Sequence, residues 1–459
     1  MLYSRCMKDN IIDMTEGNPV KLLISFSIPM LIGNLFQQVY NLADSVIVGQ
    51  LVGSAALASI GTTTSISFFF FALCNGIASG GGIITSQFFG QKDDNKVKNC
   101  ITNTGYIMII FPLVVGTASF FLAGPILHVL NTPENIFNDA KGYLKILCIG
   151  LLFVSLYNYA SSMLRALGDS KTPLYCLIFT CVLNIILDVI FVKYFCMGVK
   201  GAGWATIISQ FLSAALCLFL AFKKNPYFKF EKINLRINHE IIRQTIKIGV
   251  PLSFQFSMIA ISCMALQAVV NGFGDTTVAA FTATSRIEQI IHLPYQTLSA
   301  ALSTFCGQNY GAKKIDRAIL GYKKAMLLMG IFTLVMFPII QLGGESIIRF
   351  FVKKNEVDVI KMGATALKIT SLFYLFLGTI YMVRGILYGV GDAFFSMLNG
   401  IVEVFGRFTA PFILTKIPFI GLWGIWWSVG FVWSIAGLTA WWRYIIVKRR
   451  IKKQYETKA

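Results

Sequence analysis

Apolar stretches of the length of a membrane-spanning helix recur from one end of this chain to the other. A helix rises about 1.5 Å per residue, so roughly 20 apolar residues cross the hydrocarbon core of a bilayer. Twelve such spans can be read from the sequence: 22–48, 55–83, 101–123, 143–165, 174–195, 202–222, 245–271, 279–305, 321–342, 366–388, 395–415 and 421–446. In lipid the backbone must hydrogen-bond within its own segment, so this pattern predicts an all-α integral membrane protein with the lipid bilayer as its partner.

Composition and charge placement agree with a membrane class and argue against a nucleic-acid partner. Charged residues make up 13% of the chain, about half the usual share in soluble domains, and mean hydropathy is +0.68. The net charge is +19. However, the loops expected on one side of the membrane carry 27 Lys and Arg residues against 10 on the other, with the loop around Lys353 as a local exception. Cytoplasmic loops carry this excess, so we expect both termini in the cytoplasm and the protein in the cell membrane.

The sequence repeats itself at an offset of 221 to 223 residues. The matching blocks are Ser27–Pro29 with Gly249–Pro251, Gln87–Gly90 with Gln308–Gly311, Leu167–Asp169 with Val390–Asp392, and Gly198–Trp204 with Gly421–Trp427. The repeat predicts an N-lobe (1–222), a basic cytoplasmic linker (223–244), a C-lobe (245–446) and a basic tail (447–459). Six spans per half predict lobes related by a pseudo-two-fold axis along the membrane normal, which is a known transporter plan.

The first span carries a polar stripe that a lipid-facing helix would not need. Polar side chains recur at steps of three and four, which places them on one helix face: Asn34, Gln37, Gln38, Asn41, Asp44 and Ser45. An ionisable group inside a membrane segment is costly, so Asp44 is a functional hypothesis.

A second intramembrane acid, Asp188, shares a helix face with Asn184 at a spacing of four residues. Thr206 on the next span and Asn158 on the fourth add further polar groups. Two nearby carboxylates in a low-dielectric site tend to share a proton, and hard oxygen ligands also suit Na⁺. The first half is therefore expected to load and release a cation.

The second half is not a copy of the first, because its first span contains no acid. Its candidate contacts to substrate or cation are Gln255, Glu288, Tyr295, Glu403 and Arg407, with His292 read as a core histidine. Glu403 and Arg407, four residues apart, are expected to form a structural ion pair. Asp169 and Asp392 each follow a glycine and are expected to be turn or cap residues.

No Walker A, HExxH or GxSxG motif is present, so we expect a secondary transporter driven by an ion gradient, with no cofactor and no enzymatic activity. Two alternatives stay open. A flippase for lipid-linked oligosaccharides should line its cavity with several arginines, and the candidates here are Arg286, Arg384 and Arg407. An intramembrane enzyme would need a reactive pair or a metal cluster near one membrane face.

Across essentially its whole length the chain resembles the multidrug and toxic compound extrusion (MATE) family of secondary transporters. The resemblance rests on Gln37–Gly49, Gln87–Gly90, Arg165–Asp169, Asn184 with Asp188, Gly201–Thr206 and Gln308–Gly311. It implies two lobes in a V and export of organic, often cationic, compounds in exchange for H⁺ or Na⁺, with one protomer expected to suffice.

The same resemblance implies a cation site in the N-lobe formed by Asp44, Asn184, Asp188 and Thr206. A supporting polar network is expected around it, with Gln37, Tyr40, Asn41 and Asn158. One branch of the family carries a glutamate in the seventh span, where this chain has Ile259. We therefore do not expect the C-lobe of this chain to bind a cation in the way that branch does, although Glu288 could take the place of the missing glutamate.

Overall fold

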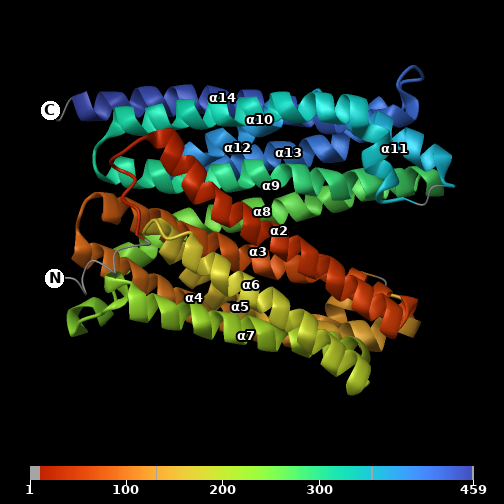
Figure 1. The fold of residues 1–459 in the computed structure, drawn as a ribbon, viewed down its shortest axis with the longest axis horizontal. Coiled ribbons are helices and arrows are strands. Elements are labelled where there is room, and N and C mark those ends of the chain that lie inside the picture. Colours follow the sequence, from red (N-terminus) through yellow and green to blue (C-terminus); the bar gives the residue numbers. More distant parts are fainter. Residues whose placement is uncertain (1–10, 131, 353–354, 457–459) are drawn as a thin grey trace. The chain divides into compact units, whose positions relative to one another are not determined.

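A computed structural model describes residues 11–130, 132–352 and 355–456 of the chain, and these residues contain helices and no strand (Figure 1). Some basic residues counted above lie outside the described residues: Arg5, Lys8, Lys353, Lys354 and Lys458, the last in the part of the predicted tail that follows residue 456.

Long helices joined by short turns make up the fold. In the first half these are α2 (Pro19–Leu51), α3 (Ser54–Gly90), α4 (Asp94–Val129), α5 (Glu134–Ala166), α6 (Lys171–Asp188) with the π-helix η1 (Val189–Tyr194), and α7 (Gly198–Lys224). Two 3-10 turns follow, η2 (Pro226–Phe228) and η3 (Lys232–Leu235). The second half has α8 (His239–Asn271), α9 (Asp275–Gly311), α10 (Ile315–Arg349), α11 (Val357–Ser371), α12 (Tyr374–Gly389), α13 (Ala393–Leu414), the 3-10 turn η4 (Gly421–Trp423) and α14 (Gly424–Glu456).

The twelve predicted spans coincide with these helices, so the fold class is confirmed. Ten of the described helices are long and apolar enough to cross a membrane, and the bent pair α11–α12 provides an eleventh. The twelfth is α9, which has 37 residues but is less apolar because it carries Arg286, Glu288 and His292. Pro29, Pro251, Pro294 and Pro411 all lie inside continuous helices.

The tenth span is broken between α11 and α12, which meet at an angle of 53°. Neither glycine nor proline stands at the break. Instead the Phe373 ring packs against Gly430 of α14, where an added Cβ would lie 2.2 Å from the ring. The ring also meets Trp427 and Phe431, with centroids 5.7 and 5.9 Å away. The bend therefore coincides with a side chain seated on a glycine of another helix.

The chain divides into two compact units, and two helices contribute to both. Unit 1 comprises Met1–Met14 and Ile28–Ser257, and unit 2 comprises Thr15–Ser27 and Met258–Ala459. The first turns of α2 thus belong to unit 2, and the first half of α8, with Gln255, belongs to unit 1.

Small residues fix the first half of α8 within unit 1. Gly76 and Gly80 of α3 face Ser253 and Gly249 of α8, and a Cβ on Gly76 would lie 2.2 Å from the Ser253 nitrogen. The Ser253 hydroxyl donates to the Leu73 carbonyl at 2.5 Å. Such close crossings between small residues are typical of membrane helices, because they maximise packing contact.

The internal repeat is visible in the backbone of single loop residues. Left-handed residues recur at equivalent positions of the two halves, 221 to 223 residues apart: Gly53 with Gly274, Lys92 with Lys313, Gly168 with Gly391, and Gly198 with Gly421. Because positive φ is rare for a side chain such as lysine, the pair Lys92 (59°) and Lys313 (61°) is especially informative. The two halves therefore share loop conformations as well as helix order.

Candidate functional site

In unit 1, helices α2 and α6 bring the two predicted acids together. The carboxyl groups of Asp44 and Asp188 lie close enough to interact directly. Asp188 is fully buried and Asp44 is half-buried. Two carboxyl groups at such a distance can bond only if a proton lies between them, and otherwise they need a cation.

The acid pair and the neighbouring Asn184 contain buried polar atoms that have no hydrogen-bond partner in the described structure. These atoms are both carboxylate oxygens of Asp188, Oδ1 of Asp44, and both amide atoms of Asn184. An unpaired polar atom in an apolar interior costs free energy, about 1–3 kcal/mol each in protein mutational data. The donor set of carboxylate and amide oxygens fits a proton or a small hard cation, which would satisfy several of these atoms at once.

Local helix geometry places Asp188 at a change of helix type. Asn184 and Asp188 lie one turn apart near the end of α6, on a buried face. The π-helix η1 begins at the next residue, Val189. Short π segments inside membrane and soluble helices are frequent at functional sites, because they re-aim the side chains beside them.

Two tyrosines complete the surroundings of the acid pair. Tyr40 lies near Gln37 on the same helix and in the field of both Asp44 and Asp188. Tyr143 of α5 lies near both acids and near Tyr40. The Tyr143 ring packs against α7 at Gly203, which has no side chain. A Cβ added there would lie 3.2 Å from the ring.

Tyr143 was not predicted as a site residue. In the sequence it stands between Lys141 and Lys145 at the start of a span, where a tyrosine usually marks the membrane interface. The one local signal is that Tyr143 stands four residues before Leu147, with which it shares a buried cluster. This spacing predicts that Tyr143 is buried, but it does not predict a position beside an acid.

No hydrogen bond joins the other predicted N-lobe residues to the acids in the described part of the chain. The Thr206 hydroxyl donates to the Ala202 carbonyl of its own helix at 3.0 Å. Asn158 is half-buried on α5 and Asn41 is exposed on α2. The structure thus joins Asp44, Asp188, Asn184, Tyr40 and Gln37, while Thr206, Asn158 and Asn41 remain predictions.

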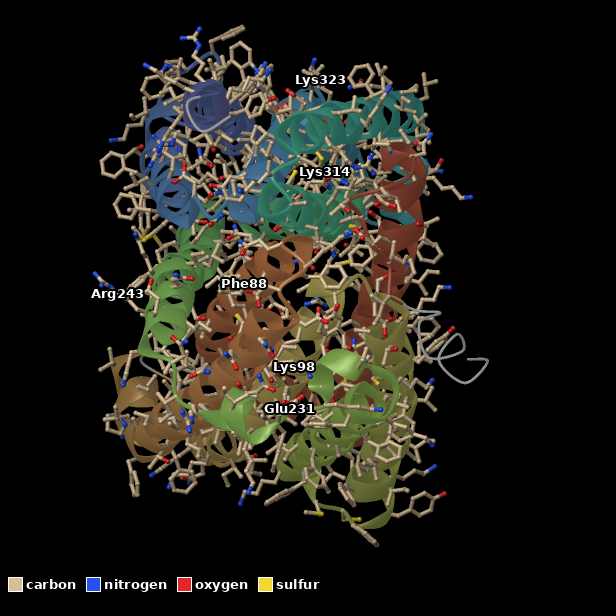
Figure 2. The ribbon with its side chains drawn as sticks, turned by 90° about the vertical axis from the view of Figure 1, so that its left-hand side faces the viewer. Phe88, Lys98, Glu231, Arg243, Lys314 and Lys323 are labelled. Carbon is tan, nitrogen blue, oxygen red and sulfur yellow. The ribbon has the colours of Figure 1, made fainter. Side chains whose placement is uncertain are left out.

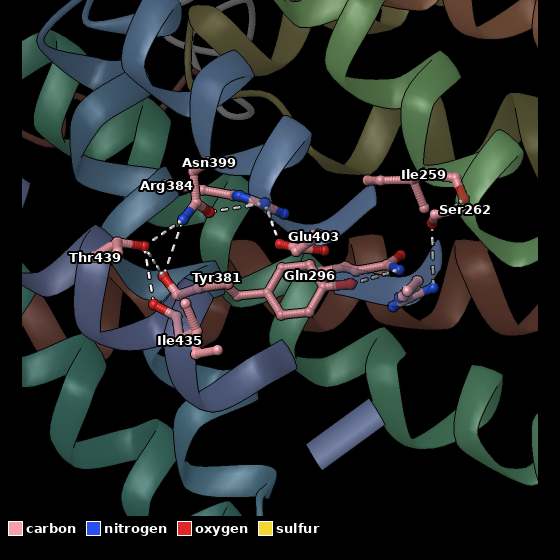
Figure 3. Close-up of polar contacts among 11 residues, drawn as sticks. Ile259, Ser262, Gln296, Tyr381, Arg384, Asn399, Glu403, Ile435 and Thr439 are labelled. Carbon is pink, nitrogen blue, oxygen red and sulfur yellow. Dashed lines mark hydrogen bonds and ion pairs between the residues drawn. The ribbon is translucent and has the colours of Figure 1, made fainter. Parts of the chain in front are cut away.

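Unit 2 contains a buried charge cluster of another kind (Figure 3). Arg384 of α12 forms an ion pair with Glu403 of α13, and both side chains are buried. Arg384 also donates to Oδ1 of Asn399 at 2.9 Å. The Asn399 amide donates in turn to the Ala436 carbonyl at 2.9 Å and to Thr439 Oγ1 at 3.1 Å, both on α14. The positive and the negative charge are thus matched within one hydrogen-bonded network.

The predicted ion pair between Glu403 and Arg407 is wrong, because Glu403 pairs with Arg384. A spacing of four residues puts both on one face of α13, but Arg384 reaches Glu403 from another helix. Arg407 instead points to α8, where it lies 3.4 Å from Ser262 Oγ and 3.3 Å from Cys263 Sγ.

The two predicted cap residues differ in what they bind. Asp169 is confirmed as a cap, because it accepts from the backbone nitrogens of Lys171 (3.1 Å) and Thr172 (2.9 Å) and from the Thr172 hydroxyl (2.6 Å). Burial of this loop residue raises the pKa of the Asp169 carboxyl. Asp392 occupies the equivalent position before α13 but makes no capping bond, and its carboxylate pairs with Arg443 Nε at 2.9 Å.

The remaining C-lobe candidates lie among aromatic side chains. The Tyr295 hydroxyl bonds Thr333 Oγ1 at 2.8 Å, and its ring stacks on Tyr381. The His292 ring meets Trp433 edge-on at 5.7 Å, but His292 Nε2 has no hydrogen-bond partner in the described structure, unlike that of a satisfied core histidine. Glu288 lies beside Thr370 on the neighbouring helix α11, and its Oε1 has no partner in the described structure.

Comparison with known proteins gives a consistent result. The family model MatE matches residues 29–190 and 251–408. The chain is 31% identical over 415 residues to the probable multidrug resistance protein YpnP of Bacillus subtilis (strain 168), covering 90% of each chain. It is 25% identical over 439 residues to the multidrug export protein MepA of Staphylococcus saprophyticus, covering 95% of each.

Among solved structures, a MATE protein in complex with MaL6 superimposes with a TM-score of 0.91 at 22% identity, covering 96% of this chain and 99% of that one. An outward-facing multidrug resistance MATE transporter superimposes with a TM-score of 0.90, also at 22% identity, covering 96% and 98%. These likenesses show that the chain has the two-lobe, twelve-helix fold of those proteins.

Proposed function

This chain belongs to the MatE family, and from that premise we propose that it is a secondary transporter that exports organic compounds from the cell in exchange for H⁺ or Na⁺. The names of its relatives, a multidrug resistance protein and a multidrug export protein, support export of several chemically different compounds. The observation that carries the coupling is the buried pair Asp44 and Asp188 with its unpartnered oxygen atoms.

The acid pair can act as the loading site for the driving ion. A proton would bridge the two carboxyl groups in one hydrogen bond, whereas Na⁺ would bind their oxygens together with Oδ1 of Asn184. In either case the ion changes which hydrogen bonds Asn184, Tyr40 and Tyr143 can make. Ion binding and substrate binding are coupled if the ion and the substrate prefer different conformations of the protein. In this proposal the ion favours the conformation that releases substrate outward.

The wider setting of the site favours organic, cationic substrates. Fixed positive charges are scarce in the membrane-spanning parts, and one of the three candidate arginines for an anionic substrate, Arg384, is already neutralised by Glu403. That arrangement supports an exporter over a flippase for a pyrophosphate-linked lipid. We further propose that both termini lie in the cytoplasm, that the protein resides in the cell membrane, and that one protomer is sufficient for transport.

The test is gradient-driven uptake of a cationic dye into inverted membrane vesicles, with H⁺ and Na⁺ gradients imposed separately. We expect the wild type to respond to at least one gradient and Asp44→Asn to respond to neither, at equal protein level. Asp275→Asn, which alters an exposed acid at the start of α9, is the matched control and should transport normally. Uptake by Asp44→Asn at the wild-type rate would refute the proposed coupling site.

A further inference from the structure

The segment between α7 and α8 is an ordered strap that runs along α4. We define the strap as residues 229–238, which include η3. Three side chains of α4 hold its backbone by consecutive carbonyl groups. Thr102 Oγ1 donates to the carbonyl of Asn234 at 2.6 Å, Tyr106 Oη to that of Leu235 at 2.8 Å, and Asn103 Nδ2 to that of Arg236 at 3.3 Å.

Two asparagines of the strap anchor it further. Asn234 is fully buried, and its amide donates to Oδ1 of Asn99 at 3.1 Å. The backbone nitrogen of Asn238 donates to Oδ1 of Asn103 at 2.8 Å. The Asn238 side chain then caps α8 by accepting from the nitrogens of Glu240 and Ile241. The strap is therefore fixed to α4 by its backbone and by these two asparagines, and at its start the Phe230 ring packs against Phe222 and Phe228.

The exposed side chains of the strap are both apolar and basic. Ile233, Leu235 and Ile237 are 59%, 49% and 63% exposed. Lys232 and Arg236 are exposed among them, and neither has an ion-pair partner among the described residues. Residues 223–247 contain seven Lys and Arg against two Glu.

The position of the strap along α4 sets its depth relative to a membrane. Its contacts at Thr102 to Tyr106 lie about 12–18 Å from the start of α4 at Asp94, by the rise of a helix. The uninterrupted apolar part of α4 begins at the next residue, Ile107, and nearby Ile110 is 62% exposed. The strap therefore lies where α4 changes from polar to apolar. Figure 2 looks onto this end of the helices, with Glu231 labelled just before η3 and Lys98 on α4.

We propose that the strap binds anionic phospholipid of the membrane leaflet that it faces. Lys232 and Arg236 take the lipid phosphates, while Ile233, Leu235 and Ile237 insert between the upper parts of the acyl chains. Exposed aliphatic and basic side chains on one segment are typical of interfacial lipid binding. The lipid is favoured over a protein partner because the strap lies level with the start of the apolar part of α4, and because its charge complements an anionic leaflet.

The experiment uses the full-length protein, with phosphatidylglycerol and phosphatidylcholine titrated in turn and the bound lipids counted by native mass spectrometry. Each basic residue near an anionic surface strengthens binding severalfold, so Lys232→Ala/Arg236→Ala should bind phosphatidylglycerol about 30-fold more weakly than the wild type. Binding of phosphatidylcholine should change little. The control Lys323→Ala/Arg449→Ala removes one exposed lysine and one exposed arginine elsewhere and should bind as the wild type does.

Further variants separate the contributions of charge and apolar surface. Lys232→Arg/Arg236→Lys should retain phosphatidylglycerol, and Ile233→Ser/Leu235→Ser/Ile237→Ser should lose it. Glycerol 1-phosphate should not compete, because it has no acyl chains. The proposal is overturned if the Ala pair binds phosphatidylglycerol like the wild type, if the control pair loses as much, or if free glycerol 1-phosphate displaces the lipid.

Discussion

Two buried charge clusters, one in each unit, differ in how their charges are satisfied. In unit 1, Asp44 and Asp188 lie together with unpartnered oxygen atoms around them. In unit 2, Glu403 meets Arg384, which is held in turn by Asn399. A pair of opposite charges is neutral without a bound ion and can serve structure alone, although Arg384 Nε has no hydrogen-bond partner in the described structure. A pair of like groups is complete only when a proton or cation arrives, which is what an ion-coupling site requires.

The repeated fold requires neither cluster. At the offset of 223 that relates the flanking blocks, Asn184 and Asp188 correspond to Arg407 and Pro411. At the same offset, Arg384 and Glu403 correspond to Ser161 and Thr180. The same helix positions therefore carry charge in one half and none in the other, so each cluster belongs to its own unit.

The largest effect on stability should come from breaking the matched pair. We expect Glu403→Gln to lower the free energy of unfolding by about 3–5 kcal/mol, because Arg384 is left buried without a counter-charge. The measurement is denaturant unfolding of the purified protein. The double variant Arg384→Met/Glu403→Leu should regain most of the loss, and a loss below about 1 kcal/mol in the single variant would contradict the assignment.

A smaller loss is expected at the amide that supports this pair. Asn399→Ala removes an acceptor for Arg384 and two donations to α14, so unfolding should become easier by about 1–3 kcal/mol. Thr439→Val removes only one of these bonds and should cost less. Equal losses in the two variants would show that the bonds of Asn399 to Arg384 and to the Ala436 carbonyl add nothing.

Replacing one acid of the pair Asp44 and Asp188 should change stability in the opposite direction. Asp188→Asn relieves two buried acids of their mutual repulsion, so we expect stability to stay level or rise by about 1–2 kcal/mol, while gradient-driven transport is lost. Thermal unfolding with and without Na⁺ is the second measurement. If Na⁺ is the coupling ion, it should stabilise the wild type and not the variant, and a strongly destabilised Asp188→Asn would make the acid pair structural.

The smallest effects should separate the two equivalent loop positions. Asp169→Ala removes a helix cap and should cost about 1 kcal/mol. Asp392→Ala removes a partly exposed ion pair with Arg443 and should cost about 0.2–1 kcal/mol. Raising the salt concentration should diminish the loss at Asp392 and leave that at Asp169 unchanged, because screening acts on the ion pair.

Sequence reasoning succeeded where the information is local. Apolar length identified all twelve spans, including α9 in spite of Arg286, Glu288 and His292, and spacing placed Asn184 and Asp188 on one face. The repeat was read from short blocks and reappears in the backbone of Lys92 and Lys313. These features depend on residues within one helix or one turn, which a linear pattern can report.

Contacts between helices could not be read from the sequence. The spacing rule paired Glu403 with Arg407, yet the partner is Arg384, 19 residues earlier on another helix. The break at Phe373 coincides with packing against Gly430, and the place of Tyr143 beside the acids depends on α2 and α6. In each case the deciding partner lies on a different helix, and no local pattern points to it.

The way in which α4 holds the strap also has an evolutionary consequence. Thr102, Asn103 and Tyr106 bind backbone carbonyls, which every amino acid possesses, so the path of the strap does not depend on the side chains at 235 and 236. Only Asn234 and Asn238 contribute their own amides to the attachment. The outward residues are therefore free to drift between descendants of this chain at little cost in folding, and selection can tune that surface to the membrane of each host.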